Sequence, residues 1–188
     1  MKLLNGKRVK DFVGNREIIL FIGAAIITQI ITSISDQLPV NIMPNLALCP
    51  VIGLLFGPFA SLGVNLVNFV NNVVTGVPIQ FCCLDFFTVF LTSYIPYRLW
   101  YSVGMDRDDR PPVLDSVRNI AKFIVMMIVS SLVYTVLYNI TYGLMDGQFV
   151  LNFEDIVRFI NVLSFSFLFG LAAILLLRYL GIRFYSPK

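Results

Sequence analysis

The chain has 188 residues, of which 57% are hydrophobic and 13% charged, and its formal net charge is +3. Its mean hydropathy is +0.82, which means more apolar surface than a soluble core of this length could bury. A net charge this small does not indicate nucleic-acid binding. The composition instead predicts an all-α integral membrane protein in which residues 1–188 form one membrane domain.

The residue types that build metal and redox sites are scarce in this chain. It contains no histidine, and its three cysteines, Cys49, Cys82 and Cys83, do not form a CxxC motif. A zinc site, a haem site or a Cys/His nucleophile therefore has almost nothing to build from. The sequence also lacks the GxxxxGK[ST] motif that cradles phosphate. We expect no metal, no cofactor and no catalytic residue, and hence no enzyme.

Six apolar segments follow a basic head at residues 1–17 and predict six transmembrane helices. The first segment lacks a small-residue cleavage site, so we expect it to remain as a helix and not to be removed as a signal peptide. The second segment is short and carries Pro44 and Pro50, which predict a bent, broken or partly re-entrant helix. The six segments cover about residues 18–34, 42–56, 58–74, 79–101, 113–142 and 156–180.

A corner between the second and third segments organises the chain. Gly57 directly precedes Pro58, and a glycine that ends one helix before a proline at the first position of the next predicts a tight helix–helix corner. Gly53 and Gly57 form a GxxxG pattern, and Ala60 and Gly63 continue the row of small residues. Such rows let membrane helices approach closely. We therefore expect a helical hairpin inside the membrane.

The charges predict how the six helices are oriented. If the amino terminus is cytoplasmic, the two termini and the region 94–122 contain every Lys and Arg except Arg158. The predicted outer loops instead carry four acidic residues, Asp36, Asp146, Glu154 and Asp155. This is the positive-inside asymmetry, so we expect both termini to be cytoplasmic in a multi-pass protein of the plasma membrane.

Polar side chains gather in the outer half of the predicted bundle, as the direction of each helix implies. Polar groups inside a membrane are costly and usually face a bundle interior or a cavity, so we expect a small-molecule cavity open to the outside. The alternative for any single amide is a hydrogen bond across helices, typically about 0.6 kcal/mol. The candidate substrate-binding residues are Gln29, Asn68, Asn71, Asn72, Asp85, Asn139, Tyr142, Arg158 and Asn161.

Asp85 is the leading functional candidate among these residues, because a carboxylate costs more to bury than an amide. Two alternatives remain for it. The side chain would either be shallow and wetted by the loop at residues 75–80, or it would pair with Arg158.

One family combines these features in the same order. The corner from Gly53 through Gly57 and Pro58, the small residues Ala60 and Gly63 after it, and a polar third segment that ends at Thr75-Gly76 resemble the S components of energy-coupling factor (ECF) vitamin transporters. The resemblance implies an S-component-like bundle of six helices with both termini cytoplasmic. It also implies a substrate pocket near the outer face, closed by the loops after the first, third and fifth helices.

The resemblance further implies partner proteins, namely a membrane coupling subunit and two cytoplasmic ATPases, with transport by toppling of the S component. Members of that family usually present an AxxxA surface on the first helix to the coupling subunit. In this chain Ala24 is followed four residues later by Thr28, and Gly23 and Ala25 complete a surface of small residues. These four residues are the candidate partner-binding surface.

The first functional hypothesis is therefore the substrate-binding subunit of an ECF-type uptake transporter, without catalysis of its own. The amides and Asp85 suggest a small polar ligand, neutral or cationic, such as a vitamin or a nucleobase-like compound. Two alternatives are an S-component-like sensor or anchor domain of a signalling protein and a structural membrane protein of the rod-shape-determining kind. An enzyme is disfavoured, because the sequence offers no acid–base pair.

Overall fold

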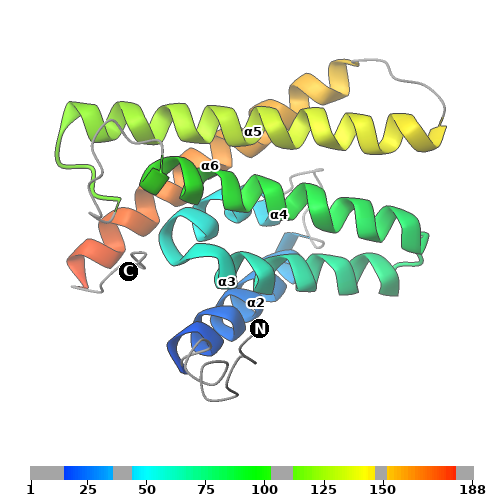
Figure 1. Cartoon of the computed structure of the whole chain (residues 1–188), viewed down its shortest axis with the longest axis horizontal. Helices are drawn as coiled ribbons and strands as arrows, with labels where there is room; N and C mark the ends of the chain where they lie inside the picture. The colour runs from blue at the N-terminus through cyan, green and yellow to red at the C-terminus, as the bar shows by residue number, and fades with distance from the viewer. Residues whose placement is uncertain (1–14, 36–43, 103–111, 147–151, 181–188) are drawn as a thin grey trace, which may run out of the picture.

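The computed structural model describes residues 15–35, 44–102, 112–146 and 152–180, and all regular structure in these ranges is helical (Figure 1). Five of these helices are long and apolar enough to cross a membrane, which is the makeup of a multi-pass membrane protein. They are α2 (Asn15–Ser35), α3 (Pro44–Val74), α4 (Ile79–Ser102), α5 (Val117–Asp146) and α6 (Phe153–Tyr179).

Helix α3 contains the predicted corner and consists of two arms. Gly57 has φ 79° and ψ −169°, a backbone conformation that favours glycine, and Pro58 opens the second arm. The Asn68 amide nitrogen of the second arm lies 4.0 Å from the Cys49 sulfur of the first. In a straight helix these residues would be about 28 Å apart. The chain therefore doubles back at Gly57, as Figure 1 shows.

The first arm of α3 is short. At 1.5 Å per residue, residues 44–56 extend over about 20 Å, less than the roughly 30 Å of the hydrocarbon core. The apolar stretch within Leu46–Val74 of α3 is 78% buried inside the protein, whereas that of α2 is 11% buried. A broken helix is tolerated at membrane depth where protein covers it. Five membrane-length helices are thus present in the described residues. The second and third predicted spans, about 42–56 and 58–74, correspond to the two arms of α3.

Serine hydroxyls donate hydrogen bonds to backbone carbonyls close to two prolines that lie inside helices. Pro96 has no N–H, so the Thr92 carbonyl of α4 loses its helical donor, and the Ser130 hydroxyl of α5 donates to it at 2.6 Å. In α3, the Ala47 carbonyl, three residues before Pro50, accepts a hydrogen bond from the Ser166 hydroxyl of α6 at 2.9 Å. These two bonds tie α5 to α4 and α6 to α3.

Helix α3 is central, and it packs against α2, α4 and α6, whereas α5 packs against α4 and α6. Two of its glycines permit close approach. A Cβ at Gly53 would overlap the Ser93 carbonyl of α4, and one at Gly63 would overlap the Phe21 carbonyl of α2. The row of small residues therefore brings backbones together on two sides of α3. In Figure 1, α2 runs obliquely to α4 and α5.

The predicted starts of the last two helices were wrong by a few residues, because capping groups set them. Helix α5 begins after Ser116, whose hydroxyl accepts a hydrogen bond from the Asn119 backbone N–H at 3.3 Å, and so starts four residues later than predicted. Helix α6 begins earlier, at Phe153. There the Asp155 carboxylate accepts the backbone N–H of Asn152 at 2.9 Å, as in a capping box.

Candidate binding site

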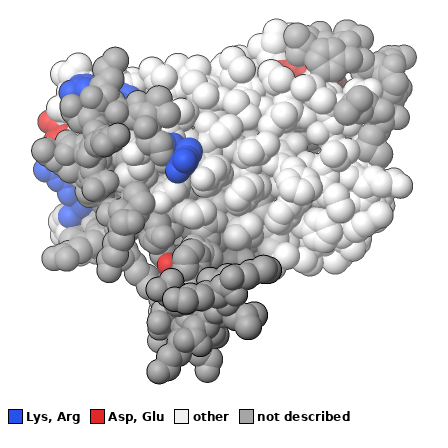
Figure 2. Space-filling view, in the orientation of Figure 1, with Lys and Arg blue, Asp and Glu red and all other residues white. Residues whose placement is uncertain are grey.

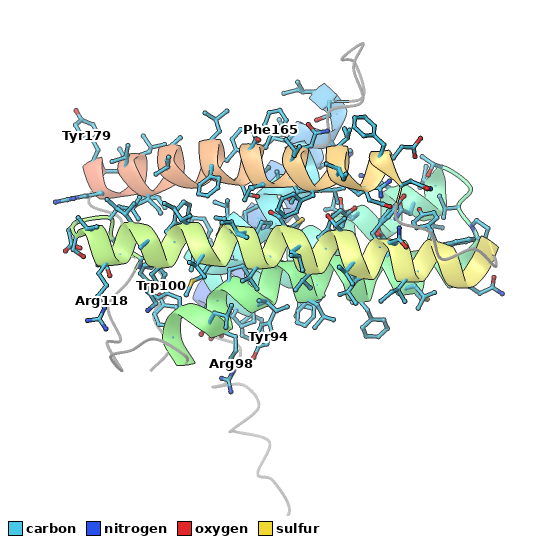
Figure 3. All side chains as sticks on the ribbon, turned by 90° about the horizontal axis from the view of Figure 1, so that it is seen from above. Tyr94, Arg98, Trp100, Arg118, Phe165 and Tyr179 are labelled. Atoms are coloured by element: carbon cyan, nitrogen blue, oxygen red, sulfur yellow. The ribbon has the colours of Figure 1, made fainter. Side chains whose placement is uncertain are left out.

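The two ends of the bundle differ in charge. Figure 2 shows Lys and Arg side chains gathered at one end, and Figure 3 places Trp100, Arg118 and Tyr179 toward that end. We call it the basic end. At the opposite end, α3 and α5 finish and α4 and α6 begin (Figure 1). We call this the polar end, because most of the predicted site residues lie there.

Asp85 lies at the polar end, on the second turn of α4. Its Oδ2 accepts a hydrogen bond from Asn72 Nδ2 at 2.9 Å, and the side chain is half-buried. Among the described residues it forms no ion pair with Lys or Arg, so the alternative of an Asp85–Arg158 pair is wrong. Its hydrogen-bond partner in the described part of the chain is thus a neutral amide.

A second carboxylate at the polar end, Asp155, is fully compensated. It is 6% exposed, and Arg158 Nη1 donates to its Oδ1 at 2.8 Å. Its Oδ2 accepts from Asn139 Nδ2 at 2.7 Å and from the Asn152 backbone N–H at 2.9 Å. A buried charge needs a counter-charge and hydrogen bonds, and Asp155 has both. This cluster ties α5 to the start of α6.

A row of aromatic rings lies beside the Asp155–Arg158 pair. Tyr134, Tyr138 and Tyr142 follow one face of α5 at four-residue spacing, with ring centroids 5.8 Å and 4.2 Å apart. The Arg158 guanidinium lies 3.8 Å from the Tyr138 ring centroid, a cation–π contact. Phe81 of α4 packs on Tyr142 at 5.3 Å. We call these four rings the aromatic row.

The asparagines of the second arm of α3 point to different neighbours. The Asn72 amide reaches a carboxylate, whereas the others bind neutral groups, as expected of amides that hold helices together. Their hydrogen-bond partners are Ser61 and Ser93 for Asn65, Cys49 for Asn68, Gln29 for Asn71 and Asp85 for Asn72.

Two further candidates lie beside the polar cluster and not within it. The Gln29–Asn71 hydrogen bond, at 3.3 Å, is exposed and lies between α2 and α3. Asn161 is half-buried, one turn after Arg158. The structure thus groups Asn72 with Asp85, and Asn139 and Tyr142 with Arg158. Asn68 instead lies between the two arms of α3, beside Cys49.

Sequence reasoning missed Asp155 and most of the aromatic row. The charge pattern predicts an outer loop for Asp155, although its position three residues after Asn152 is that of a capping box. The four-residue spacing of Tyr134, Tyr138 and Tyr142 was the available signal for a shared helix face.

The candidate partner-binding surface on α2 requires a correction. Ala24 is 5% exposed and Thr28 is fully buried, with the Thr28 hydroxyl donating to the Ala24 carbonyl at 2.8 Å. Both side chains belong to the contact with α3 and do not offer an accessible surface. Gly23 and Ala25 are half-exposed, so only these two remain available to a partner.

No family model matches the chain, and searches of curated proteins and of solved structures likewise return no match. The described residues contain no group of three or more metal-ligating side chains.

Proposed function

We propose that this chain is the substrate-binding membrane subunit of an ECF-type uptake transporter and that it binds a small polar molecule at the polar end. The observation that carries the proposal is the half-buried carboxylate of Asp85, whose hydrogen-bond partner among the described residues is the Asn72 amide. An apolar bundle gains no stability from a charge held in this way. A ligand that completes its hydrogen bonds is the simplest reason for its presence.

The charge distribution supports an outward orientation of the polar end. In the positive-inside pattern the basic end faces the cytoplasm, which directs the polar end outward. On this proposal the chain has six spans, with the first arm of α3 as the second, and both termini are cytoplasmic. Two cytoplasmic ATPases would supply the energy of ATP hydrolysis through a membrane coupling subunit, because the sequence of this chain lacks the GxxxxGK[ST] phosphate-binding motif.

A structural or sensory role is the second candidate, and one observation favours it. In the Asn139–Asp155–Arg158 cluster the carboxylate and the guanidinium already balance each other. A cluster whose only role is to hold α5 against α6 would have this property. Ligand binding separates the two candidates.

The test is the thermal stability of the purified protein against vitamins, nucleobases and polyamines. A ligand at 100 times its dissociation constant adds about 2.7 kcal/mol, which for a chain of this size raises the melting temperature by roughly 5–10 °C. The shift should disappear in Asn72→Ala, which removes the Asp85 partner. It should persist in Asn119→Ala, because that amide bonds Asp115 at the basic end.

A flat response across the panel would reject the binding role and favour the structural or sensory candidate. Equal loss of the shift in Asn72→Ala and Asn119→Ala would reject the polar end as the site.

A further inference from the structure

The polar end carries a carboxylate, Asp85, that has no cationic partner among the described residues. The charged side chains in the buried contacts at this end are Asp85, Asp155 and Arg158. Arg158 forms an ion pair with Asp155, with 2.8 Å between Nη1 and Oδ1. Asp85 has a neutral partner, Asn72, at 2.9 Å. A negative charge of this kind attracts a cation of the ligand.

Electron-rich rings lie close to that charge. Phe81 and Asp85 are one turn apart on the same face of α4, and Phe81 packs on Tyr142 of α5 at 5.3 Å. Tyr142 in turn stacks on Tyr138, with ring centroids 4.2 Å apart. The Arg158 guanidinium, 3.8 Å from the Tyr138 ring, shows that a face of the row accommodates a cation.

We propose that the ligand is an organic cation, with an ammonium group or a positively charged heterocycle, whose charge binds between Asp85 and the aromatic row. The inference rests on the proposed function and names its substrate class. The carboxylate would contribute a charge-assisted hydrogen bond or ion pair, and the rings would contribute cation–π contacts, as aromatic cages do for quaternary ammonium groups. A neutral molecule of the same shape would leave Asp85 as it is now.

The experiment compares probes of matched shape and different charge. The pairs are choline with 3,3-dimethyl-1-butanol, putrescine with 1,4-butanediol, and 1-methylnicotinamide with nicotinamide. Each is added to the purified full chain, and binding is followed by calorimetry and by the melting temperature. We expect the cationic member of at least one pair to bind at least about tenfold more tightly than its neutral partner, as the loss of one charged hydrogen bond implies.

Two substitutions test whether the Asp85 carboxylate is the group that distinguishes the cation from its neutral analogue. Asp85→Asn keeps a carbonyl oxygen that can accept the Asn72 hydrogen bond, so the unliganded melting temperature should change little. It should lower the affinity for the cation by about 10- to 100-fold and leave the affinity for the neutral partner unchanged. The control is Glu154→Gln, an exposed carboxylate in the first turn of α6 at the same end. It should change neither affinity.

A second variant keeps the inference testable even if Asp85→Asn does not fold. Phe81→Leu retains an apolar side chain and removes the ring, so it should reduce the ratio of cation to neutral affinity by about 2- to 30-fold.

The outcomes separate the inference from the proposed function. Binding of neutral compounds equal to or tighter than that of their cationic partners, or equal effects of Asp85→Asn and Glu154→Gln, would overturn the cation inference and leave the binding role intact. No response to the pairs or to the wider panel would overturn both.

Discussion

Removing the Ser130 hydroxyl should destabilise the bundle because of a proline in the neighbouring helix. Pro96 deprives the Thr92 carbonyl of its helical donor, and Ser130 replaces that donor at 2.6 Å. Ser130 is fully buried and Thr92 is 1% exposed, so water cannot take the place of the hydroxyl in Ser130→Ala. The carbonyl would then be buried without a hydrogen bond.

The expected loss of stability follows from two bounds. A buried carbonyl left without a donor costs about 1–3 kcal/mol, whereas cross-helix hydrogen bonds in membrane proteins average about 0.6 kcal/mol and reach about 1.7. We expect Ser130→Ala to cost about 1–2 kcal/mol. In a Pro96→Ala background the residue at 96 regains an N–H for the Thr92 carbonyl, so the same substitution should cost about 1 kcal/mol less.

The assay is reversible unfolding of the purified protein in mixed micelles of mild detergent and sodium dodecyl sulfate, with both backgrounds measured as a double-mutant cycle. The matched control is Ser131→Ala, one residue along. Ser131 is also fully buried, and its hydroxyl has no hydrogen-bond partner among the described residues. Its loss should be neutral or slightly stabilising. Equal costs of Ser130→Ala in the two backgrounds, or a Ser131→Ala cost as large as that of Ser130→Ala, would refute the reasoning.

Three further predictions concern packing, charge and orientation. Gly53→Ala should destabilise by about 1–3 kcal/mol or more, because its Cβ would overlap a backbone carbonyl of α4, whereas Gly23→Ala, with nothing within 4 Å of its Cβ, should be neutral in the same unfolding assay. Asp155→Asn should lower the free energy of unfolding by about 2–3 kcal/mol, since it removes the counter-charge of a guanidinium bound at 2.8 Å; an unchanged stability would contradict a structural role. The exposed cysteine, Cys83, is first replaced by serine. A membrane-impermeant maleimide should then label Phe153→Cys on intact cells and Val117→Cys only after permeabilisation. These residues are 77% and 84% exposed, and the reverse labelling would invert the proposed orientation.

Local backbone chemistry made parts of the fold predictable from the sequence. The corner at Gly57 needs only a residue that tolerates positive φ and a proline that starts a helix, and both stand next to each other in the chain. The start of α4 at Ile79, as predicted, follows the turn at Gly76 and Pro78 in the same way. The starts of α5 and α6 were misplaced because apolar periodicity does not report which polar residue caps a helix.

The sequence predicted at which end of the bundle the candidate site residues lie, but not which of them form hydrogen bonds with one another. Helix direction predicts amides and the Asp85 carboxylate at one end of the bundle, and the structure has them there. It could not distinguish Asn71 from Asn72, because adjacent residues on a helix point about 100° apart and the face each one meets depends on packing. In the structure Asn71 bonds Gln29, and Asn72 bonds Asp85.

Packing also decided the role of α2. The small residues of its sequence suggested an accessible surface, but the same smallness lets α3 approach closely and bury Ala24 and Thr28. Small residues indicate that a neighbouring helix packs closely, and the sequence alone does not say whether that helix belongs to the same chain.

The most direct test of a binding role is to identify what the protein retains during purification. The chain is purified in mild detergent without added ligand and then denatured, and the released small molecules are quantified by mass spectrometry beside those from Asp85→Asn and Glu154→Gln. The account predicts a polar compound with a positively charged group, released from the wild-type chain and from Glu154→Gln in near-stoichiometric amount and strongly depleted from Asp85→Asn. Release of no such compound from the wild-type chain, or of equal amounts from all three proteins, would contradict it.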